Sequence, residues 1–248
     1  MPGTEVRQAL ERLTASLRKA FGDDLLSVVL YGSAARDDHY GGGSDLNVVA
    51  VVKRLELDTL ARGGETMRLW EQQGNRPILF LSPEWITGSC DVFPLEFLDI
   101  LESHVVVSGA DPFAGLTVSH SNLRLQCESE LKTKLIHLRT GYVEFHQDPD
   151  QLSRLVAASF ASIAAVCRGV LRLAGQPVPA ASIDVLRTVS RLCGLDIGPF
   201  EQAAALKRGG PAALKQDPSA LFKAYYAQLE ALARAVDAGI THSGGSTR

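Results

Sequence analysis

Two apolar segments, Leu25–Tyr31 and Leu46–Val52, constrain the fold of this chain more than any other feature. Each is rich in valine and leucine, and each has the length and composition of a buried β-strand. The first ends at Gly32-Ser33, and the second begins within the triplet Asp45-Leu46-Asn47. We therefore expect two strands that hold a Gly-Ser turn near one carboxylate and one carboxamide.

This combination of residues suits the binding of a triphosphate. Gly32 allows close approach of the backbone, and the N–H and hydroxyl of Ser33 are donors for phosphate oxygens. Asp45 and residue 47 occupy positions i and i+2 of a strand, so both side chains should point to one face and share one Mg²⁺ ion. Arg36 follows Ser33 by about one turn and could reach a phosphate, but a solvated surface arginine explains it equally well.

The same residues resemble the signature of the polymerase-beta-like nucleotidyltransferase superfamily, in which a Gly-Ser pair precedes Asp-x-Asp or Asp-x-Glu. The resemblance implies a nucleotidyltransferase fold and, if the protein is active, Mg²⁺ and ATP as cofactors. It assigns Asp45 a catalytic and metal-binding role, residue 47 a metal-binding role, and Gly32, Ser33 and Arg36 a role in binding the nucleotide.

Three departures from the signature predict a degraded metal site. Asn47 brings no charge, and one charge pair at 4 Å contributes about 4 kcal/mol at an effective dielectric constant near 20. The third carboxylate of the family lies on the next strand, but residues 76–81 contain no acid. Glu84, beyond that strand, is a speculative replacement. The acidic and histidine residues of the intervening loop are more typical of a solvated loop than of replacement ligands: Asp37, Asp38 and His39.

The pattern up to residue 116 predicts a nucleotidyltransferase-like domain of the α+β class, with a small mixed sheet and flanking helices. Apolar residues repeat at helical spacing from Thr4 to Gly22, and Ser82-Pro83 is a typical helix start. The other expected elements are a helix over 58–73, weakened by Gly63-Gly64, a helix over 94–103, and strands over 77–81 and 104–107.

Residues 117–240 predict an all-α helical bundle, and the polar segment 241–248 predicts a disordered tail. Apolar stripes indicate successive long helices joined by short Gly/Pro loops, with Gly194 closing one of them. The order of the two domains resembles that of antibiotic nucleotidyltransferases, which modify aminoglycosides or lincosamides. That resemblance implies a nucleotide and a small-molecule acceptor as partners, and it leaves a homodimer open.

A second resemblance carries little weight. Arg139 and His146 match the Arg-x(4–6)-His spacing of HEPN (higher eukaryotes and prokaryotes nucleotide-binding) ribonucleases, whose helical domains accompany such transferases. Chance readily produces this spacing in a chain with six histidines and many arginines. Thr140, which follows the arginine, is also less polar than the residue the family favours.

Composition excludes several classes of protein. A net charge of −3 and a pI near 6.1 argue against a nucleic-acid-binding protein. No uninterrupted apolar run approaches the roughly 20 residues of a membrane span, and the N-terminus does not resemble a signal peptide. The four cysteines form no C-x-x-C pair. We therefore expect a cytoplasmic protein with reduced thiols and no membrane partner.

Three functions remain open. The first is a nucleotide-binding protein whose transferase activity is weak or lost. The second is an active Mg²⁺-dependent transferase that moves a nucleoside monophosphate from ATP to a hydroxyl of a small molecule. The third is a regulatory protein that uses the bundle as an interaction surface.

Overall fold

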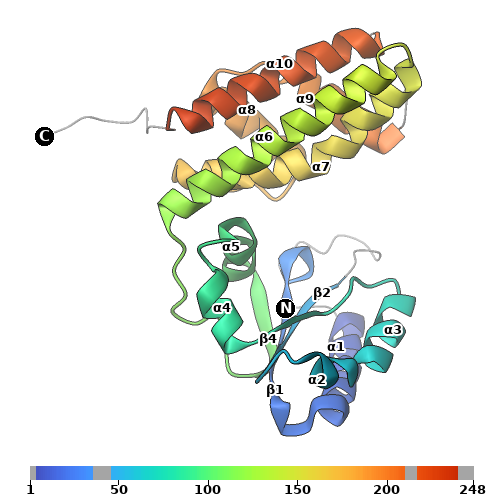
Figure 1. Cartoon of the computed structure of the whole chain (residues 1–248), viewed down its shortest axis with the longest axis vertical. Coiled ribbons are helices and arrows are strands. Elements are labelled where there is room, and N and C mark those ends of the chain that lie inside the picture. The colour runs from blue at the N-terminus through green and yellow to red at the C-terminus, as the bar shows by residue number, and fades with distance from the viewer. Residues whose placement is uncertain (1–3, 36–45, 210–216, 240–248) are drawn as a thin grey trace, which may run out of the picture. The chain divides into compact units, whose positions relative to one another are not determined.

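The computed structural model describes residues 4–35, 46–209 and 217–239. The chain divides into two compact units, Met1–Ser119 and His120–Arg248, and each is described by itself. The first unit is a small sheet with flanking helices and the second is helical (Figure 1). The expected α+β class, with a small mixed sheet and flanking helices in the first part and a helical second part, is confirmed.

Within the part of the first unit that the structure describes, the sheet has four strands in the order β3-β2-β1-β4. β1 (Leu25–Tyr31) pairs antiparallel with both β2 (Asn47–Val52) and β4 (His104–Gly109). β3 (Leu79–Leu81) pairs parallel with β2, so the sheet is mixed. The bounds predicted for the first strand are those observed. The third strand is shorter than predicted, and Pro77, which has no N–H to donate, lies outside it.

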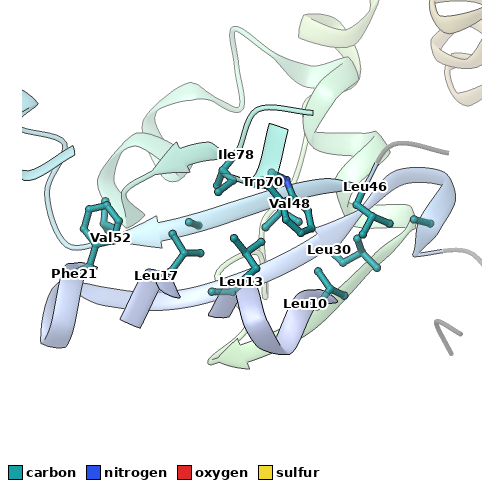
Figure 2. Close-up of a cluster of buried hydrophobic side chains, with 13 residues drawn as sticks. Leu10, Leu13, Leu17, Phe21, Leu30, Leu46, Val48, Val52, Trp70 and Ile78 are labelled. Atoms are coloured by element: carbon teal, nitrogen blue, oxygen red, sulfur yellow. The ribbon is translucent and has the colours of Figure 1, made fainter. Parts of the chain in front are cut away.

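One face of the sheet packs against α1 (Thr4–Phe21) and α3 (Gly64–Gln72). α1 presents an apolar stripe at helical spacing, and α3 adds Trp70 (Figure 2). These side chains cover alternate residues of the two central strands, including Val28, Leu30 and Val48. The four residues of the α1 stripe are all buried: Leu10, Leu13, Leu17 and Phe21.

The opposite face packs against α4 (Pro83–Ser89) and α5 (Pro94–Glu102). Ile86, Phe97 and Ile100 from these helices, together with Phe113, cover the other set of alternate strand residues. Ser82 caps α4 as predicted, because its hydroxyl accepts a hydrogen bond from the backbone N–H of Trp85 at 3.1 Å.

The single helix predicted over residues 58–73 is wrong. The segment forms two helices, α2 (Leu57–Ala61) and α3, with Gly63 between them. A Cβ atom on Gly63 would lie 2.9 Å from a ring carbon of Phe21 and 3.1 Å from a ring carbon of Phe80. The chain therefore passes too close to these two rings for a side chain at residue 63.

The second unit consists of α6 (His120–Phe145), α7 (Pro149–Leu173), α8 (Ser182–Cys193), α9 (Gly198–Gly209) and α10 (Pro218–Asp237). α7 packs against the other four helices and supplies the largest share of the core. α6 and α7 lie side by side and antiparallel, and α10 runs beside α6 (Figure 1). Gly194 ends α8 in the left-handed conformation, with φ +65°, as predicted.

Among the described residues, α7 is long and apolar enough to cross a bilayer. Half of its apolar window is buried inside the structure. Two of the four free cysteines also lie in this core. Burial raises the pKa of the Cys127 thiol to about 12 and raises the pKa of the Cys167 thiol further, so both stay protonated.

Gly109, at the end of β4, tests the packing of the sheet. Its φ is +86°, and an added Cβ would lie 2.0 Å from the carbonyl oxygen of Leu26. Gly109→Ala should lower the free energy of unfolding by at least about 2 kcal/mol more than Gly74→Ala, measured by urea denaturation. Gly74 is the matched control, because its φ is +84° and nothing lies within 4 Å of its added Cβ. Equal losses would contradict the close pairing of β1 and β4.

Candidate functional site

The turn after β1 requires glycine. Gly32 begins a short 3₁₀ turn, η2 (Gly32–Ala34), with φ +79°. Its N–H donates to the carbonyl oxygen of Ser103 at 3.0 Å, and its own carbonyl accepts from the N–H of Ala35 at 3.1 Å. A Cβ atom at residue 32 would be strained by this backbone and would lie 3.2 Å from Nδ2 of Asn47.

Asn47 lies directly beside this turn. It opens β2, is half-buried, and is the cross-strand partner of Tyr31, the last residue of β1. The preceding residue is fixed from outside the sheet, since the N–H of Leu46 donates to Oδ1 of Asn75 at 3.3 Å. Asn75 in turn donates to the carbonyl of Trp70 at 3.4 Å. The structure therefore places Asn47 beside Gly32, and the role of either residue in binding a nucleotide or a metal stays a prediction.

A row of polar side chains crosses three strands at this end of the sheet. Tyr31 pairs with Asn47 on one side and with His104 on the other. By strand alternation, all three lie on the face covered by α5. The His104 ring lies 3.0 Å from the carbonyl oxygen of Ile100 and 3.3 Å from the carboxylate of Asp111, which holds its orientation.

Two charged side chains act on Tyr31. Burial is the main reason why the pKa of its phenol lies above the ordinary value; the positive charge of Arg76 lowers that pKa and the negative charge of Asp99 raises it. Asp99 is half-buried on α5, one turn before Ser103. Ser103 connects Asp99 to the glycine turn: its hydroxyl donates to the backbone carbonyl of Asp99 at 3.1 Å, and its own carbonyl accepts from the N–H of Gly32.

Sequence reasoning missed Asp99. The signature given above includes no residue from this helix, and only the fold brings α5 to the glycine turn. The available signal was an acid within the apolar run Phe97-Leu98-Asp99-Ile100-Leu101. An acid in such a run is half-buried when the helix packs on a sheet, and half-buried acids often have a functional partner.

The remaining predicted site residues are placed only in part. The backbone of Ser33 lies in η2, but its side chain is not among the described atoms. Arg36 and Asp45 lie outside the described residues, as do Asp37, Asp38 and His39. Their assignment to the nucleotide and to the metal stays a prediction.

The strand register argues against Glu84 as the missing third carboxylate. β3 ends at Leu81, beside Val51, and exposed Glu84 follows that end. Asn47 lies at the opposite end of β2, roughly 13 Å away along the strand at about 3.3 Å per residue. Extended backwards, the same register brings Pro77 opposite Asn47. The position beside Asn47 on the next strand therefore carries no acid.

The described residues do not fit a two-metal centre. Within residues 4–35, 46–209 and 217–239, no group of three or more histidine, cysteine, aspartate or glutamate side chains has the arrangement of a metal site. Near the glycine turn they offer the neutral amide of Asn47 and the carboxylate of Asp99. Such a set suits at most one weakly held cation.

The charges around Tyr31 can be tested in the absence of any ligand. Asp99→Asn should lower the phenol pKa of Tyr31, because it removes a negative charge, and Arg76→Gln should raise it, because it removes a positive one. NMR titration with ¹³C-labelled tyrosine measures both shifts, and Tyr31→Phe assigns the signal among the five tyrosines. Shifts of the same sign in both variants would contradict the arrangement.

Comparison with known proteins supports the fold. No family model matches the chain, and the search of curated proteins found no match. Among solved structures, the chain is similar to the spectinomycin adenyltransferase AAD(9) from Enterococcus faecialis, crystallised with ATP and spectinomycin. The TM-score is 0.56 at 13% sequence identity, over 92% of this chain and 100% of that chain. At this identity the similarity shows the fold alone: this chain has a nucleotidyltransferase fold with a helical C-terminal part.

Proposed function

We propose that this protein binds a nucleoside triphosphate, with ATP as the first candidate, at the turn that follows β1, and that its transferase activity is weak or lost. The observation that carries the proposal is the contact between Gly32 and Asn47, which joins the glycine turn to the start of β2. The structural neighbour, which has the same fold, was crystallised with ATP.

The glycine turn suits the phosphates. The absence of a side chain at Gly32 leaves the backbone open to close approach, and the N–H groups of a 3₁₀ turn are oriented donors for an anion. The hydroxyl of Ser33 and the guanidinium of Arg36 would add further donors. Arg76, whose charge acts on Tyr31, adds positive potential at the same end of the sheet.

Asn47 is the reason for proposing reduced activity. A neutral amide oxygen at this position gives up a charge pair with a cation, which is about 4 kcal/mol at 4 Å and an effective dielectric constant near 20. Asp45 would remain as the carboxylate of the metal site. Phosphoryl chemistry depends on neutralising the charge that develops on the phosphates, so a weakly held ion slows it.

One observation favours the alternative of an active transferase. The next strand has no acid opposite Asn47, but Asp99 supplies a half-buried carboxylate whose charge acts on Tyr31. A carboxylate there could accept the proton of an acceptor hydroxyl. In this alternative the acceptor is a small molecule, as spectinomycin is for the neighbour. The third function, a regulatory protein, requires no nucleotide.

Calorimetric titration with ATP, with and without Mg²⁺, distinguishes the three functions. Binding that does not depend on Mg²⁺ supports the proposal, whereas Mg²⁺-dependent binding with release of pyrophosphate supports the active enzyme. Absence of binding under both conditions leaves the regulatory function.

Gly32→Ala should reduce ATP affinity at least tenfold, because the side chain strains the turn and fills the space beside Asn47. Gly115→Ala is the matched control, since its φ is +76° and nothing lies within 4 Å of its added Cβ. If the two variants bind ATP equally well, the nucleotide does not lie at the glycine turn.

Asn47→Asp should tighten Mg²⁺-dependent nucleotide binding about tenfold or more, because it restores a charge next to the ion. Binding without Mg²⁺ should weaken instead, since the new carboxylate repels the phosphates. The two titrations are compared on the same preparation. Unchanged or weaker Mg²⁺-dependent binding would show that residue 47 does not face a cation.

A further inference from the structure

The helical unit contains a cavity of about 430 Å³ that the proposed function does not use. It lies between α6 and α10, where Arg139, Tyr142 and Val143 face Phe222, Lys223 and Tyr226. Tyr142 is about 33 Å along α6 from His120, at 1.5 Å per residue. The volume falls in the usual range of small-molecule sites, roughly 300–1,000 Å³.

Aromatic rings dominate the lining. The rings of Tyr142 and Phe222 stack with their centroids 5.1 Å apart and their planes at 22°. Phe222 and Tyr226 are nearly parallel, at 6.4 Å and 11°. Val143, which also lines the cavity, is 75% exposed. Flat rings held in one row suit a flat apolar ligand, which gains contact area with little loss of side-chain freedom.

The two cations of the lining differ. The positive charge of Arg139 is balanced by Glu230, whose carboxylate lies 3.3 Å from the guanidinium. The guanidinium also donates a hydrogen bond to the hydroxyl of Tyr226. The same group lies 5.7 Å from the centre of the Tyr226 ring. Lys223 is exposed and has no hydrogen-bond or ion-pair partner among the described residues. An apolar lining with one uncompensated positive charge attracts a ligand that carries a negative one.

We propose that this cavity binds a small aromatic anion, such as an aromatic carboxylate or sulfonate. Its rings lie against Tyr142 and Phe222, and its charge lies toward Lys223. All of the cavity's lining residues belong to the helical unit. Because Glu230 balances the charge of Arg139, the charge of Lys223 favours a ligand with a negative charge.

Fluorescence titration with anilinonaphthalene sulfonate tests this proposal on the full chain. N-phenylnaphthylamine is the matched ligand, because it has the same rings without the sulfonate. Both should bind the native protein with one site, and the sulfonate should bind more tightly. Lys223→Gln should weaken binding of the sulfonate about three- to fivefold, as loss of an exposed charge pair does, and leave N-phenylnaphthylamine unchanged.

Val143→Glu should weaken both ligands at least tenfold, because it places a charged side chain at the apolar rim. Ile136→Glu is the control, since Ile136 is 57% exposed on the same helix and does not line the cavity. Circular dichroism confirms that each variant is folded.

Two results would overturn the proposal. The first is a loss of affinity in Lys223→Gln that is equal for the sulfonate and for N-phenylnaphthylamine, or a loss of affinity for either ligand that is equal in Val143→Glu and Ile136→Glu. The second is a dimer in sedimentation velocity that Val143→Glu dissociates, because the cavity would then be part of an interface between two copies of the chain.

Discussion

The left-handed backbone of Gly32, in contact with Asn47, is the constraint on which the rest of the first unit depends. Three strands meet at this point: β1 ends there, β2 begins there, and Gly32 is hydrogen-bonded to Ser103, the residue before β4. A larger residue at position 32 would require both a strained φ and displacement of the Asn47 amide. A glycine at this position therefore lets the backbone come close to a ligand, which is the property that a phosphate site needs.

The distribution of acids around this turn differs from the pattern that the superfamily resemblance implies. Asn47 is neutral, and Pro77 lies opposite it on the next strand. The half-buried acid that the structure does bring close, Asp99, comes from α5 on one face of the sheet. Asp99 adds a single carboxylate and no chelating pair, so Asp45 would still be the acid that holds a metal ion.

The sequence predicted those elements whose bounds depend on neighbouring residues along the chain, such as strand composition and helix caps. The bounds of β1, the cap at Ser82 and the end of α8 at Gly194 follow from composition and from the demands of helix ends. The pair Gly63-Gly64 marked a weak point in the predicted helix, but the close approach of Phe21 and Phe80 to Gly63 could be seen only in the fold. The role of Asp99 did not follow either, since only the packing of α5 on the sheet brings it to Tyr31. The aromatic cavity joins residues as far apart in sequence as Arg139 and Tyr226, and no motif marks such a pair.

The most direct measurement of the central claim is a backbone NMR titration of the full chain with a non-hydrolysable ATP analogue. The amide signals of Gly32, Ala34 and Asn47 should shift together and saturate with one dissociation constant. Shifts confined to residues away from the glycine turn, or no shifts at millimolar analogue, would contradict a nucleotide site at this end of the sheet.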